Sequence, residues 1–148
     1  MTGVRLPDPL QLAPVGPASS HARAYIRTGL RSLGRDALVD SAQLGVTEMV
    51  TNACLHARTP MVVALRLIAP DIVRIEVTDS SPRAPELRPP DAMATTGRGL
   101  RLLTSFGRWG VDPLTPPDIG KTVWFEPWAE PVAGSGWDIS EPEEWVGA

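Results

Sequence analysis

A stripe of three polar side chains lies within one segment whose apolar residues repeat at helical spacing. Glu48, Asn52 and His56 follow one another at four-residue intervals, which stacks them on one side of a helix expected over residues 37–57. A carboxylate can take a proton from a nucleophile, and a carboxamide oxygen can ligate a hard cation such as Mg²⁺. A plain solvated face explains the same spacing. Glu48 and Asn52 lie off the apolar stripe, so we expect substitutions there to leave the domain folded.

Two further positions could contact a small ligand. Asp79 closes a β-branched segment just before a proline-rich stretch. A carboxylate there can accept a hydrogen bond from a ligand amino group, or it can simply start a turn. Gly97-Arg98-Gly99 precedes a predicted helix, where glycines let the backbone approach an anion and free N–H groups can hold a phosphate. A turn leading into the helix explains this pattern equally well, with Arg98 in solvent.

The segment Gly120-Lys121-Thr122 ends like a phosphate-binding P-loop. That motif also requires a glycine at the position of Thr115 and a helix after the threonine. The chain has neither, because strand-forming residues follow. We therefore exclude a P-loop and predict a strand over 121–125.

The expected elements are helices and pairs of short strands. Apolar residues at helical spacing predict the helices, and β-branched runs predict the strands. The order along the chain is a short strand at 10–12, helices at 18–33 and 37–57, a hairpin of 61–68 and 72–78, a loop at 80–97, a helix at 99–106, and strands at 108–111 and 121–125. This order predicts an α/β (α+β) two-layer sandwich, with a mixed, mostly antiparallel sheet covered on one face by helices.

Composition narrows the class of protein. The 148 residues are 43% hydrophobic with a net charge of −3, which suits one compact domain and argues against neutralising nucleic-acid phosphates. One cysteine excludes an intramolecular disulfide. No apolar run of membrane-spanning length and no secretory signal is visible, so we expect a cytoplasmic protein without membrane or direct nucleic-acid contacts. Lys121 is the only lysine among 14 basic residues.

Charge divides the chain near residue 126. Residues 127–148 carry five acidic groups and no basic one, together with several tryptophans. We expect 1–126 to form the folded domain and 127–148 to be a loosely ordered acidic tail. A partner-binding strip is the alternative interpretation of the tail, because tryptophans often anchor interfaces.

The order of these motifs resembles the GHKL ATPase superfamily, which includes gyrase, histidine kinases and mismatch-repair ATPases. The segment TEMVTNACLHA at 47–57 is similar to its N box and VTDSSPRAP at 77–85 to its G1 box. GRGL at 97–100 is similar to its G2 box, and GKTVWF at 120–125 to its closing strand. Within the superfamily, the chain looks like the small stand-alone proteins related to anti-sigma factor serine kinases.

The resemblance implies a Bergerat-type fold that binds ATP and Mg²⁺ between helices, sheet and a lid at 80–97. By motif position, Glu48 would be the general base and Asn52 the Mg²⁺ ligand. Asp79 would contact the adenine amino group, and Thr122 would lie near the adenine. The groups against the phosphates would be Gly97, Arg98 and Gly99.

The resemblance also implies a serine/threonine protein kinase that phosphorylates an anti-anti-sigma (STAS-type) partner and sequesters a sigma factor, and it suggests a homodimer. One departure favours a different class. The related kinases have D-x-G-x-G in the G1 box, whereas Ser80, Ser81 and Pro82 follow Asp79 here. Glycines let the backbone approach a nucleotide, and proline lacks an N–H donor. The alternative is therefore a non-catalytic module that binds nucleotide or protein and regulates a partner by occupancy.

Overall fold

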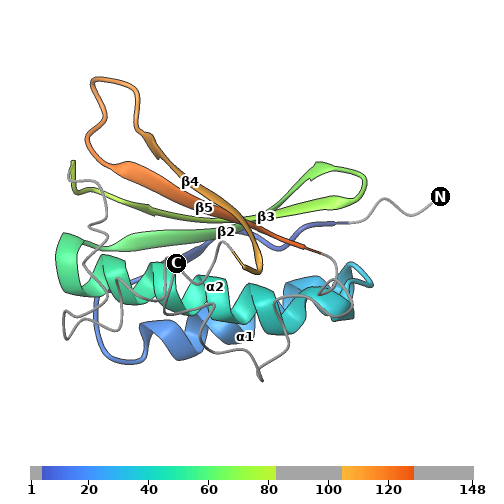
Figure 1. Ribbon diagram of the computed structural model, residues 1–148. Helices are drawn as coiled ribbons and strands as arrows, with labels where there is room; N and C mark the ends of the chain where they lie inside the picture. The colour runs from blue at the N-terminus through green and yellow to red at the C-terminus, as the bar shows by residue number, and fades with distance from the viewer. Residues whose placement is uncertain (1–4, 83–104, 129–148) are drawn as a thin grey trace, which may run out of the picture.

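Two helices and five strands make up the part of the chain that the computed structural model describes, residues 5–82 and 105–128 (Figure 1). The helices are α1 (Ala18–Ser32) and α2 (Val39–Asn52). The strands are β1 (Leu10–Leu12), β2 (Met61–Ala69), β3 (Ile72–Asp79), β4 (Gly107–Pro113) and β5 (Lys121–Pro127). Each of these elements falls on a segment predicted as helix or strand, with its ends shifted by a few residues.

The five strands form one antiparallel sheet in the order β1-β2-β3-β5-β4. β2 and β3 are a hairpin, and β5 lies between β3 and β4. In the register of β3 and β5, Thr78 lies opposite Thr122 and Asp79 lies opposite Lys121. Because successive side chains of a strand point to opposite faces, these two neighbouring pairs lie on opposite faces of the sheet.

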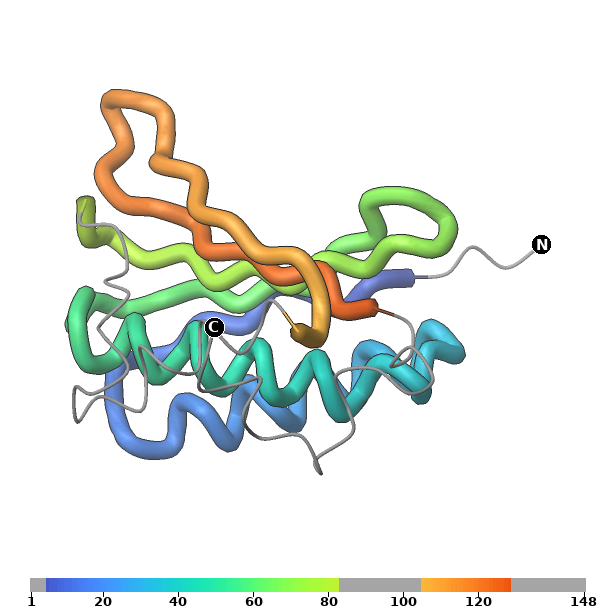
Figure 2. The backbone as a smooth tube through the Cα atoms, in the orientation of Figure 1, coloured from blue at the N-terminus to red at the C-terminus, as the bar shows by residue number. Residues whose placement is uncertain are grey.

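Both helices lie on one face of the sheet, as the tube in Figure 2 shows. α1 packs along α2, and α2 contacts β3 and β5. Side chains from both layers interlock into one core. Those with no exposed surface are Ala22, Ile26, Leu30, Ala42, Val46 and Val50 from the helices and Val63, Ile75 and Phe125 from the sheet. The predicted two-layer sandwich, with helices covering one face of the sheet, is confirmed, and the sheet expected to be mixed and mostly antiparallel is antiparallel throughout its described strands.

The other face of the sheet is polar along its described strands. Arg66 of β2 donates from Nε to Oε1 of Glu76 at 2.6 Å. Arg74 of β3 donates from Nε to Oε2 of Glu126 at 2.7 Å, and its guanidinium lies 4.4 Å from the ring centre of Trp124. These side chains alternate with core residues along the same strands, which is the pattern of a sheet with one buried face.

The helix predicted over 37–57 is interrupted at both ends. A 3₁₀ turn at Asp36–Leu38 precedes α2, and a π-helical turn at Ala53–Ala57 follows it. Arg58 then takes a left-handed backbone conformation with φ of 57°, and its N–H donates to the carbonyl of Ala53 at 2.9 Å. Isolated π turns are rare and occur often at functional sites, because they change the direction of side chains at the end of a helix.

Several predictions concern residues outside the described ranges. Most of the expected loop at 80–97 and of the expected helix at 99–106 lies there, as does the tail beyond Trp128. Phe106, the expected last residue of that helix, lies in a turn leading into β4. The N–H of Trp128 donates to the carbonyl of Phe106 at 2.9 Å, which ties the end of β5 to the start of β4.

None of the helices in residues 5–82 and 105–128 has the length and hydrophobicity needed to cross a membrane.

Gly45 lets α2 lie close to the sheet, and a methyl group added there should destabilise the fold. A Cβ on Gly45 would lie 2.3 Å from Cδ2 of Phe125, whose ring is fully buried and cannot move aside. The change Gly45→Ala gains about 1 kcal/mol of helix propensity. Overpacking a core costs about 1–3 kcal/mol, so we expect a net fall in the free energy of unfolding measured with urea.

Gly16→Ala is the control, because nothing lies within 4 Å of a Cβ at that position. A Gly45→Ala protein as stable as the wild type would contradict this account of the contact between α2 and β5.

Candidate functional site

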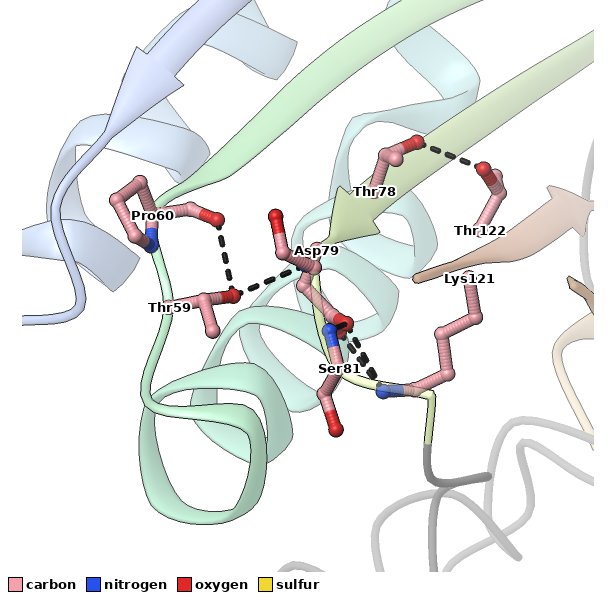
Figure 3. A network of polar contacts seen from close by, with 8 residues as sticks. Thr59, Pro60, Thr78, Asp79, Ser81, Lys121 and Thr122 are labelled. Carbon is pink, nitrogen blue, oxygen red and sulfur yellow. Dashed lines mark hydrogen bonds and ion pairs between the residues drawn. The ribbon is translucent and has the colours of Figure 1, made fainter. Parts of the chain in front are cut away.

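The end of α2 and the adjoining ends of β3 and β5 meet at one end of the fold. Thr59 follows the π-helical turn, and its Oγ1 accepts a hydrogen bond from the N–H of Ser80 at 3.0 Å (Figure 3). Ser80 is the residue directly after β3, and β5 begins opposite the last residue of β3. Three segments that the sequence analysis singled out separately are therefore brought to the same place.

Asp79 lies at the centre of this end, on the face of the sheet that the helices cover. Its side chain is 2% exposed, and its Oδ1 accepts a hydrogen bond from the N–H of Ser81 at 2.8 Å. The ammonium of Lys121 lies 3.0 Å from Oδ1 and 3.0 Å from Oδ2. A buried carboxylate needs such partners, because burial removes the water that would otherwise stabilise its charge.

Lys121 is the site residue that the sequence analysis missed. The resemblance predicts Thr122 near the adenine, but the Oγ1 of Thr122 lies 2.7 Å from that of Thr78, on the face of the sheet opposite to Asp79 (Figure 3). Lys121 shares the face of Asp79, and its side chain is only 8% exposed. The sequence did offer a signal, because Lys121 is the sole lysine and follows a glycine at the start of a strand. The strand register that places Lys121 beside Asp79 could not be read from the sequence.

Gly120 holds the start of β5 against the end of β3. Its φ is +141°, and a Cβ on it would lie 2.1 Å from the carbonyl oxygen of Asp79. Any other residue would therefore push the two backbones apart and would be strained in this conformation. The glycine is required here by a close approach between strands.

Asn52, at the end of α2, is buried, with 6% of its surface exposed. A plain solvated face therefore does not describe this residue, and the expectation that a substitution there leaves the domain folded stays a prediction. Neither Oδ1 nor Nδ2 has a hydrogen-bond partner among the described residues. A buried, unpaired carboxamide is costly, and such a group calls for an explanation such as a ligand.

His56, one turn after Asn52, also has a buried polar atom without a described hydrogen-bond partner. Its Nε2 is buried and has no hydrogen-bond partner within residues 5–82 and 105–128. His56 lies in the π-helical turn, so the helix is wider where it follows Asn52. Two unpaired polar side chains therefore follow one another at the end of the helix that adjoins Asp79.

Glu48 is half-buried, one turn before Asn52. Burial raises the pKa of its carboxyl group, because the ionised form loses hydration. A glutamate with a raised pKa accepts a proton more readily near neutral pH than an exposed one does, which suits a general base.

The donor set suits a nucleotide with a hard cation. Asn52 offers a buried carboxamide oxygen, which is a ligand that Mg²⁺ takes. Asp79 offers a buried acceptor of the kind that fixes a ligand amino group. The expected phosphate contacts at Gly97, Arg98 and Gly99 lie outside the described residues and stay predictions.

Comparison with known proteins gives the class. Residues 11–108 match the family described as the histidine kinase-like ATPase domain. A stretch of 72 residues is 40% identical to an uncharacterized protein of Streptomyces coelicolor and covers 45% of this chain and 69% of that protein. The fold and the family match define a GHKL-type, ATP-binding protein. This chain belongs to the histidine kinase-like ATPase domain family.

The ion pair between Asp79 and Lys121 should show strong coupling. Removing one partner leaves the other charge buried and unpaired, which costs about 3–5 kcal/mol. We therefore expect Asp79→Asn and Lys121→Met each to lower the free energy of unfolding, and the double variant to recover most of that loss. Denaturation of the four proteins measures the coupling.

Arg66→Met serves as the control, because the side chain of Arg66 is 59% exposed and its pair with Glu76 should contribute little. If the double variant loses as much free energy of unfolding as the two single variants together, the pair is not coupled.

The half-buried carboxylate of Glu48 should cost stability at neutral pH. Its pKa is higher in the folded chain than in the unfolded one, so ionisation favours unfolding as pH rises. We expect Glu48→Gln to melt at a higher temperature than wild type at pH 7–8. This advantage should shrink as pH falls towards the ordinary glutamate pKa of about 4.

Asp40→Asn is the matched control, because Asp40 is exposed in the first turn of the same helix, where a negative charge is favourable. It should not raise the melting temperature. A Glu48→Gln advantage that stayed constant across this pH range would rule out the burial of a charge as its cause.

Proposed function

We propose that this chain is an ATP-dependent serine/threonine protein kinase that acts on an anti-anti-sigma-type partner and controls the sequestration of a sigma factor. The observation that supports this proposal most is the position of Glu48 and Asn52 one turn apart on α2. A half-buried carboxylate with a raised pKa precedes, by one turn, a buried carboxamide without a described partner. A base for a hydroxyl proton and a ligand for a metal therefore lie on one rigid element.

Each residue has a distinct role in this proposal. Glu48 takes the proton of the partner hydroxyl as that oxygen attacks. Asn52 holds Mg²⁺ through Oδ1, and Asp79 accepts a hydrogen bond from the amino group of the adenine. When bound, Mg-ATP supplies the phosphoryl group and neutralises the charge that develops on it. The proposed phosphate contacts are Gly97, Arg98 and Gly99.

Occupancy without catalysis is the second candidate function, and one feature favours it. Ser81 and Arg83 stand where the related kinases have the glycines of D-x-G-x-G, and the N–H of Ser81 donates to Oδ1 of Asp79. The backbone after β3 is therefore hydrogen-bonded to the carboxylate that would bind the adenine. A module of this kind would bind nucleotide or a protein partner and regulate by binding alone.

Two variants on α2 separate nucleotide binding from chemistry. We expect Asn52→Ala to weaken Mg-ATP binding about ten- to a hundredfold, since it removes the proposed contact to a charged group. Glu48→Gln should leave binding nearly intact but slow phosphotransfer by about 10²–10⁴, the usual effect of losing a general base. Calorimetric titration measures the first effect, and transfer of radiolabelled phosphate to candidate partners from the same genome measures the second.

Asp40→Asn is again the control, because it removes a carboxylate from the same helix at its far end. If Glu48→Gln transferred phosphate at the wild-type rate, Glu48 would not be the general base. Tight ATP binding by the wild type without transfer to any candidate partner would favour the occupancy module.

A further inference from the structure

Two side chains at the end of α2 carry buried polar atoms whose burial the folded core does not explain. Both Oδ1 and Nδ2 of Asn52 and the Nε2 of His56 lack a hydrogen-bond partner among the described residues. Such atoms lose their hydrogen bonds to water without replacement, which destabilises the folded chain. Two such residues only four positions apart point to one ligand that both of them contact.

The four-residue spacing suits two ligands of one metal ion. Residues four apart on a helix are neighbours on one face, and two histidines at this spacing bind zinc in the H-E-x-x-H motif. Asn52 is the last residue of α2, and His56 lies in the π-helical turn that follows it. Cys54 lies two residues from each of them, and residues two apart do not face each other, so we do not count its thiol as a ligand.

We propose that Nε2 of His56 joins Oδ1 of Asn52 as a second protein ligand, and that the pair binds a divalent transition-metal ion in preference to Mg²⁺. The inference rests on Asn52 as the metal ligand of the proposed function. A carboxamide oxygen suits Mg²⁺, whereas an imidazole nitrogen suits transition metals. One added nitrogen ligand therefore changes which ion the end of α2 selects.

The described residues supply few other metal ligands. Within residues 5–82 and 105–128, no group of three or more His, Cys, Asp or Glu side chains could hold a metal ion. Water and the phosphates of a bound nucleotide can fill the other coordination positions, as they do at many sites that bind a metal with ATP. We therefore expect the ion to bind weakly by itself and more tightly together with ATP.

Calorimetric titration of Co²⁺ and of Mg²⁺ into the nucleotide-free protein tests the role of His56. The wild type should bind Co²⁺ more tightly than Mg²⁺. His56→Phe keeps a ring of similar size but has no ligand nitrogen, so Co²⁺ should bind about tenfold more weakly or worse, while Mg²⁺ binding changes much less. Even residues that only support a metal ligand change metal affinity about 10–100-fold. Asn52→Ala should weaken the binding of both ions.

His21→Phe is the matched control, because His21 is the other histidine of the chain and lies exposed on α1. It should keep the wild-type preference for Co²⁺. A wild type without that preference, or a His56→Phe protein that retains it, would overturn the role of His56 and leave the proposed function intact. Binding of Co²⁺ through His56 in a wild type that binds no ATP would overturn the proposed function and leave the metal site.

A second measurement applies even where His56→Phe does not fold. The chain has two histidines, so protein labelled with ¹⁵N-histidine has two sets of imidazole signals in the NMR spectrum, which His21→Phe assigns. Zn²⁺ is the probe, because it binds imidazole nitrogen directly. Added Zn²⁺ should shift the Nε2 signal of His56 and leave the signals of His21 in place. Zn²⁺ that leaves His56 unchanged, or that shifts both histidines alike, would overturn the proposal.

Discussion

The close approach of α2 to β5 is the contact on which the rest of the site depends. Gly45 has no side chain and lies against the ring of Phe125, so the helix can lie low on the sheet. Glu48 and Asn52 follow Gly45 on the same rigid helix, while Lys121 lies four residues before Phe125 on the same strand. One packing contact therefore sets the distance between the two halves of the site. A bulkier residue at either position would separate them before it affected any polar group directly.

Polar burial is the second constraint. Asn52, Asp79 and Lys121 all lie in a region that a purely structural core would fill with apolar side chains. Asp79 and Lys121 compensate each other by charge and hydrogen bonding, whereas Asn52 has no compensation among the described residues. Buried ion pairs seldom add stability over apolar residues of the same size. Their presence at one end of the fold is therefore better explained by recognition than by folding.

The proposed catalytic role of Glu48 and the stability of the fold make opposite demands on α2. The partial burial that raises the pKa of Glu48 makes its ionised form less stable in the folded chain, yet the same burial makes the carboxylate a better proton acceptor. On the other face of the sheet, Arg66 in its pair with Glu76 is largely exposed, whereas Glu126 is buried and pairs with Arg74. A buried charge therefore has a partner on either face of the sheet.

Local pattern in the sequence was enough to predict the elements and the two-layer class. The apolar repeat at 37–57 and the β-branched runs at 61–68 and 72–78 depend on residues close together in the chain, and the described helices and strands follow them. The sequence also placed Asp79 at the end of a strand, because a turn-forming stretch follows directly. The importance of residues 48 and 52 came from their helical spacing and from the resemblance of their motif.

Tertiary structure alone decided which polar groups meet. Whether Lys121 or Thr122 shares a face with Asp79 depends on the register of β3 and β5, and a shift of one residue would exchange them. The burial of Asn52 depends on how α2 packs against the sheet and on the π-helical turn that ends it, and neither follows from helical spacing. Residues far apart in sequence share a site only through pairing and packing. The sequence by itself therefore determined the elements and the candidate side chains, and the fold determined their partners.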